Sequence, residues 1–119
     1  MRGEVGHGGV GRQLDEPFKL AYGQTADIRG EGLSLTFSEV SEDSRCPTGA
    51  TCITAGRAAI VVKAMKGGST ADLRLTMPGA ATAGFQEYSI TVAALTPHPA
   101  VDHLPAHGEY TATLQVERR

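Results

Sequence analysis

Alternating apolar and polar positions run through most of the chain and predict β-strands. In the clearest run, residues 33–38, Leu33, Leu35 and Phe37 share one face, and Ser or Thr residues occupy the other. This alternation is typical of a strand with one buried face and one hydrated face. The same pattern predicts about seven strands, at residues 18–20, 26–28, 33–38, 58–65, 72–77, 88–92 and 110–116.

Glycine and proline separate these strands and predict the turns. Gly67 and Gly68 predict a hairpin between residues 58–65 and 72–77. The strand at 58–65 is apolar at most positions, which favours a place inside a sheet. A turn at Gly23 is expected to join the first two strands as part of a meander. Residues 79–84 carry small side chains and are expected to form an exposed loop.

A chain of 119 residues has room for one hydrophobic core. Residues 1–16 show no periodicity and are interpreted as a flexible N-terminal segment, which leaves residues 17–119 as a single domain. No segment shows the periodicity of a helix. The expected fold is all-β, a small antiparallel β-sandwich. The final strand begins at Tyr110, which resembles the tyrosine-led strand of immunoglobulin-like sandwiches.

Charge and composition narrow the classes of partner. The formal net charge is −2 and charges of both signs are interspersed, so no basic patch for nucleic acid is expected. No run approaches the roughly 20 apolar residues of a transmembrane helix. The chain has no Trp and six Phe and Tyr residues, of which only Phe85 and Tyr22 are expected near the surface, which disfavours sugar binding on an aromatic platform.

The two cysteines, Cys46 and Cys52, are six positions apart. A zinc site would need further ligands at knuckle spacing, and a redox site would have a Cys-x-x-Cys pattern. A disulfide is therefore the favoured interpretation, and with it an oxidising compartment. The protein is expected to be extracytoplasmic, either periplasmic or secreted, and a lipid anchor on a longer precursor is compatible with that location.

The segment around the cysteines resembles a group of small bacterial secreted and lipoprotein domains. These domains carry a D-S-R-C-P-x-x-x-x-C-x-x-A-G signature, which matches residues 43–56. The likeness extends from about Phe18 through residues 88–90 and 95–99 to residues 110–114. The resemblance implies an extracytoplasmic β-sandwich with a disulfide-closed loop, and it carries over no catalytic residue or cofactor. The chain departs from the pattern at Thr54, where a tryptophan is expected.

The functional prediction is a non-enzymatic binding module for a protein or small ligand. Ring closure between Cys46 and Cys52 would hold the loop in one conformation and lower the entropy cost of docking. The predicted contact residues are Arg45, Pro47, Thr48 and Thr51. A protease-inhibitor loop is a narrower form of this idea. The competing interpretation is that the disulfide only stitches a long connection, with Arg45 paired to Glu42 or Asp43 at the surface.

A loop-based metal site is the alternative function. Four residues that could bind zinc or copper fall within one proline-interrupted connection, namely His98, Asp102, His103 and His107. Their spacing matches no standard metal motif, so no cofactor is predicted. An enzyme ranks third among the possible functions. The chain lacks a Gly-x-Ser-x-Gly nucleophile elbow, and its adjacent carboxylates would face opposite ways on a strand, so no catalytic residue is predicted.

Overall fold

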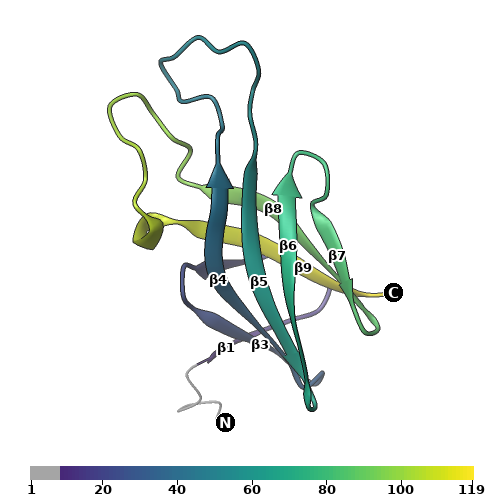
Figure 1. Cartoon of the computed structure of the whole chain (residues 1–119). Helices are drawn as coiled ribbons and strands as arrows, with labels where there is room; N and C mark the ends of the chain where they lie inside the picture. Colours follow the sequence, from purple (N-terminus) through teal and green to yellow (C-terminus); the bar gives the residue numbers. More distant parts are fainter. Residues whose placement is uncertain (1–8) are drawn as a thin grey trace.

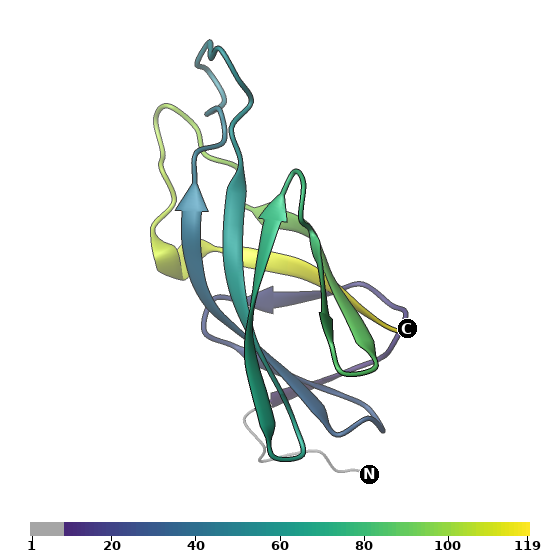
Figure 2. The same cartoon turned by 45° about the vertical axis from the view of Figure 1, so that its right-hand side comes forward.

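The computed structural model describes residues 9–119 as two β-sheets packed face to face (Figures 1 and 2). One sheet has the order β1 (Gly9–Arg12), β3 (Thr25–Ile28), β4 (Leu33–Asp43), β5 (Ala58–Lys66) and β6 (Ser69–Met77). The other has the order β2 (Phe18–Ala21), β9 (Thr111–Arg118), β8 (Tyr88–Thr96) and β7 (Thr82–Phe85). A single 3-10 turn, η1 (His107–Glu109), precedes β9. The predicted small all-β sandwich is confirmed, with nine strands in the described part of the chain rather than seven.

The core lies between the sheets and is built from the alternating positions read in the sequence. Leu33, Leu35 and Phe37 of β4 are buried, as predicted. They pack with inward-facing residues of both sheets, among them Leu20, Ile60, Val62, Leu75, Tyr88, Ile90, Leu114 and Val116. Burial of these side chains supplies the main driving force for joining the two sheets.

Two strands were missed by the sequence prediction. β1 lies inside the segment predicted to be flexible, and residues 1–8 of that segment lie outside the described residues. β7 occupies part of the predicted loop at 79–84 and pairs with β8. Phe85, predicted near the surface, is buried, and Tyr22 is half-buried against the core. β1 and β7 contain few large apolar side chains, so their sequences lack the apolar–polar alternation of a strand. They are strands because their backbones pair with β3 and β8.

The predicted meander at the start of the domain is wrong. β2 pairs with β9 in one sheet, whereas β3 pairs with β4 in the other. The turn at Gly23 therefore carries the chain across the sandwich and does not close a hairpin. β1 also departs from the antiparallel expectation, because it runs parallel to β3. The hairpin between β5 and β6 at Gly67 is confirmed, and β5 lies inside its sheet between β4 and β6.

β4 continues five residues beyond its predicted end, and two β-bulges change its register in that part. Ser38 and Ser41 are the extra residues against β5, and their hydroxyls donate to the carbonyls of Val61 and Ala59. Inward-facing positions consequently fall at a spacing of three, at Phe37, Val40 and Asp43. The second bulge brings the Asp43 carboxylate to the inner side at the end of the sandwich, where the connection between β4 and β5 begins.

Candidate functional site

Two long loops project side by side from one end of the sandwich (Figures 1 and 2). We call residues 44–57, between β4 and β5, the disulfide loop, and residues 97–110, between β8 and β9, the histidine loop. Backbone hydrogen bonds join them, from Thr48 N–H to the Pro99 carbonyl at 2.8 Å and from Val101 N–H to the Thr48 carbonyl at 3.0 Å. The imidazole Nε2 of His98 adds a third bond, to the Cys46 carbonyl at 2.8 Å. The two loops therefore form one structural unit.

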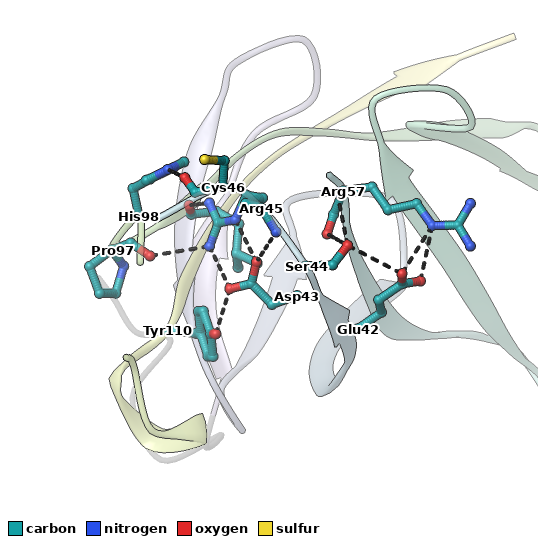
Figure 3. A network of polar contacts seen from close by, with 10 residues as sticks. Glu42, Asp43, Ser44, Arg45, Cys46, Arg57, Pro97, His98 and Tyr110 are labelled. Atoms are coloured by element: carbon teal, nitrogen blue, oxygen red, sulfur yellow. Dashed lines mark hydrogen bonds and ion pairs between the residues drawn. The ribbon is translucent and has the colours of Figure 1, made fainter. Parts of the chain in front are cut away.

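Arg45 holds the base of this unit to both sheets (Figure 3). Its Nε and Nη2 donate to the two carboxylate oxygens of Asp43, at 2.8 and 2.9 Å. Its Nη1 and Nη2 also donate to the carbonyls of Leu95 and Pro97, at 2.7 and 3.2 Å. The guanidinium fork thus connects the end of β4 to the end of β8. The side chains of Arg45 and Asp43 are only 13% and 10% exposed, so solvent screens this ion pair weakly.

Tyr110 completes the clamp formed by Asp43, Arg45 and Tyr110. Its hydroxyl donates to Asp43 Oδ2 at 2.6 Å (Figure 3). Burial raises the pKa of Asp43, but the hydrogen bonds from Arg45 and Tyr110 outweigh burial, so the pKa of this carboxyl lies below its ordinary value. Burial and the nearby carboxylate raise the pKa of the Tyr110 phenol to about 12. At neutral pH the clamp therefore contains a carboxylate, a guanidinium and a neutral phenol.

The stem of the disulfide loop continues the β4–β5 ladder beyond the sheet. Ser44 exchanges backbone and hydroxyl hydrogen bonds with Arg57, and Cys46 N–H donates to the Ala55 carbonyl. Gly56 fits between these pairs only because it lacks a side chain. Its φ is +71°, and a Cβ atom there would overlap the Ser44 carbonyl. Gly56 is thus required for the stem to close.

Beyond the stem, the Cys46–Cys52 disulfide predicted from the sequence is present. Of the predicted contact residues, Thr48 and Thr51 are exposed and Pro47 is half-buried. Arg45 points the other way, into the clamp. It pairs with Asp43, as in the competing interpretation, but the pair is largely buried and does not lie at the surface. Glu42 instead pairs with the exposed Arg57, at 3.1 Å. The predicted set therefore divides into one residue that positions the loop and others that reach its surface.

The predicted metal ligands are not brought together. His98 is bonded to the Cys46 carbonyl, His103 pairs with Glu109 at 2.9 Å, and the ring of His107 stacks on Tyr22. Asp102 is exposed. Across residues 9–119, no group of three or more His, Cys, Asp and Glu side chains is arranged to hold a metal ion. The histidines here stabilise the histidine loop through separate contacts.

Exposed apolar side chains mark the outer surface of both loops. Ile53 is fully exposed, and Leu104 and Val101 are 69% and 62% exposed. Among the described residues only one other large apolar side chain, Met65 at the far end of β5, is comparably exposed. Val101 also packs next to Gly49, where a Cβ would come within 2.9 Å of its methyl group. The unit therefore presents apolar groups on a backbone that is fixed from several sides.

Sequence reasoning missed the apolar residues and the partners of Arg45. Ile53, Val101 and Leu104 stand outside any alternating run, which is itself a signal, because an apolar residue in a polar loop has no sheet face to fill. The spacing of three from Phe37 through Val40 to Asp43 was the available sign that Asp43 turns inward. The contact between Asp43 and Tyr110 spans 67 residues, and no local pattern encodes it.

No helix among residues 9–119 is long and apolar enough to cross a membrane. Comparison with known proteins found no matching protein-family model, curated protein or solved structure. The function of the site is therefore argued from its geometry.

Proposed function

We propose that this protein is a non-enzymatic, extracytoplasmic binding module that recognises another protein through the tips of the disulfide loop and the histidine loop. The observation that carries the proposal is the placement of Ile53, Val101 and Leu104, which are exposed on two loops that are bonded to each other and clamped to both sheets. Apolar side chains presented to solvent on a fixed backbone can serve as anchors in a protein–protein contact.

Preorganisation of the loops supports the same proposal. The disulfide, the Arg45 clamp and the backbone bonds between Thr48 and the histidine loop restrict the unit before any partner arrives. A partner would therefore bind without first ordering these segments, and the entropy cost of association would be lower than for free loops. Arg45 is a positioning residue in this proposal, whereas Ile53, Val101 and Leu104, together with Thr48 and Thr51, would touch the partner.

The extracytoplasmic location is part of the proposal and is supported by the disulfide, because disulfides persist in oxidising compartments. The resemblance of residues 43–56 to small bacterial secreted and lipoprotein domains supports it as well. Alkylation of thiols in intact cells tests it directly. We expect Cys46 and Cys52 to resist alkylation until a reductant is added, and two free thiols in freshly trapped protein would contradict the location.

Photo-crosslinking tests the contact surface. A photo-reactive amino acid at Ile53 or Leu104 is expected to crosslink one and the same protein in cells that produce this chain. The matched control is Met65, which is also exposed and apolar but lies away from the loops. Equal crosslinking of that protein from Met65, or different products from Ile53 and Leu104, would contradict a shared surface.

Elemental analysis of the purified protein separates this proposal from the metal-binding alternative. The proposal expects less than one-tenth equivalent of zinc or copper per chain. One equivalent, lost on substitution of His98 or His103, would favour the loop-based metal site and would overturn the binding-module proposal.

A further inference from the structure

A concave surface lies away from the two projecting loops, where the chain crosses from β1 in one sheet to β2 in the other (Figure 1). It is a hollow of about 410 Å³. Its walls are the end of β1, the connection at residues 13–17, the start of β2 and the residue that follows β3. The lining residues are Gly11, Arg12, Gln13, Glu16, Pro17, Phe18, Lys19 and Arg29.

The charges of this lining are unbalanced. Arg12, Lys19 and Arg29 contribute three positive charges and Glu16 one negative charge, so the net lining charge is +2, in a chain whose overall charge is −2. Within residues 9–119, none of the three cations makes an ion pair. Every other Lys and Arg in that range does so, apart from Arg119 at the C-terminal end. Among residues 9–119, the cations without a carboxylate partner in that range are therefore concentrated at one hollow, apart from Arg119.

Arg12 is held in place at the hollow by contacts that leave much of its hydrogen-bonding capacity unused. Its Nη2 donates to the Lys19 carbonyl at 3.2 Å, and its guanidinium carbon lies 5.7 Å from the centre of the Phe18 ring. Its Nε is buried and has no hydrogen-bond partner in the described part of the chain. A buried donor without a partner is uncommon in folded proteins and costs stability unless something offsets it. A nearby anion would offset the uncompensated charge.

Arg29 reaches the same hollow from the other side. Its backbone N–H donates to the Arg12 carbonyl at 2.8 Å, which ties the end of β3 to the end of β1. Its side chain lies across Gly11, where a Cβ atom would come within 3.3 Å of Nε. The absence of a side chain at Gly11 thus leaves room for the side chain of Arg29, which lines the hollow together with Arg12.

We propose that this hollow binds the phosphate group of a small phosphorylated molecule. Arginine forks and lysine ammonium groups donate charge-assisted hydrogen bonds to the oxygen atoms of a phosphate, and all three cationic residues line the hollow. The lining charge of +2 complements a phosphate dianion. A volume of about 410 Å³ is in the range of small-molecule sites and exceeds what a phosphate ion alone would fill. The remaining space accommodates an organic group beside Phe18 and Pro17.

Titrations followed by backbone amide NMR test the proposal in the full chain, with inorganic phosphate, phenyl phosphate and acetate as probes. We expect saturable shifts at Gly11, Gln13 and Arg29 with both phosphates, at least fivefold tighter binding of phenyl phosphate, and no saturation with acetate. If inorganic phosphate binds as tightly as phenyl phosphate, the hollow does not recognise an organic group beside the phosphate, and that part of the proposal is wrong. Shifts that rise linearly and spread over all basic residues would overturn the site.

Variants assign the effect to the lining residues. Arg29→Gln is expected to weaken phenyl phosphate binding at least tenfold, whereas Lys63→Gln, which removes an exposed cation elsewhere, should change it less than twofold. Glu16→Gln removes the negative charge of the lining, so it should tighten binding about threefold. A gain of affinity cannot result from unfolding. Unchanged binding in both Arg29→Gln and Glu16→Gln would overturn the proposal.

Discussion

The guanidinium of Arg45 and the carboxylate of Asp43 form a two-point ion pair, with N–O distances of 2.8 and 2.9 Å, although only Ser44 separates them in the chain. The pair closes over the end of β4 and leaves Arg45 free to bond the carbonyls of Leu95 and Pro97 across the sandwich. A short stretch of sequence thereby connects the disulfide loop to both sheets.

Removal of this connection should destabilise the fold. In the Arg45→Met variant, Asp43 keeps its charge in a poorly hydrated place, so we expect the free energy of unfolding to fall by about 3 kcal/mol. Urea unfolding followed by far-UV circular dichroism measures it. The control is Arg57→Met, which breaks an exposed pair with Glu42 and should cost less than about 1 kcal/mol. Equal losses in the two variants would mean that the clamp contributes no more than a surface ion pair.

Gly56 should be the least replaceable glycine of the loop stem. Gly56→Ala introduces a Cβ that overlaps the Ser44 carbonyl in addition to the strain of a positive φ, so the stem cannot close without moving. Gly67→Ala is the matched control, because its φ is also positive, at +62°, but its surroundings are open. We expect Gly67→Ala to cost about 1 kcal/mol in urea unfolding and Gly56→Ala to cost clearly more. The reverse order would contradict the stem geometry.

The clamp should give the protein an alkaline limit of stability. The pKa of Tyr110 is about 12 in the folded protein against an ordinary value of 10.0. The folded state holds this proton more tightly, so the contribution is complete below pH 10 and is lost as pH rises towards 12. A two-unit shift corresponds to about 2–3 kcal/mol. Phenolate absorbance should show a late-titrating component, and Tyr110→Phe should abolish that component.

In acid, the stability contributed by the clamp should change with pH in the opposite direction, falling as the pH falls. The pKa of Asp43 is lowered in the folded protein, so its contribution is present above the ordinary value of 3.8 and is lost as pH falls below it. Urea unfolding at pH 7 and pH 3 is expected to differ less for Asp43→Asn than for the unmodified chain. Glu31, whose pKa is lowered by hydrogen bonds from Arg118 and Tyr88, should retain part of the acid dependence. An identical pH dependence in both proteins would contradict the role of Asp43.

Reduction of the disulfide should affect the loops far more than the sheets. Replacing Cys46 and Cys52 together with serine opens a ring of seven residues, for which chain entropy predicts a loss of about 2 kcal/mol. The chemical shifts of backbone amides should change in the disulfide loop and at Ala100 and Val101, while the amides of β5 and β8 keep their shifts. Widespread changes in β5 and β8 would show that the disulfide supports the core.

Much of the architecture was predictable because strands bury alternate residues. The pattern Leu33, Leu35, Phe37 identified β4 without any knowledge of its neighbours, and the Gly67 turn identified the β5–β6 hairpin. The candidate site was predictable in part. The spacing of Cys46 and Cys52 indicated the disulfide, and the same reasoning offered Arg45 both as a contact residue and as a partner of Asp43. Its inward orientation depends on carbonyls some 50 residues away.

The sequence by itself thus determined the strand class, most of the core and the disulfide, because alternation, turn residues and a short cysteine spacing are local properties of the chain. Only the tertiary structure decided that β2 and β3 belong to different sheets, that the disulfide and histidine loops form one unit, and that Arg12, Lys19 and Arg29 surround one hollow. The physical reason is that these relationships are set by packing between distant segments. Each depends on which faces bury together, and no local period specifies that choice.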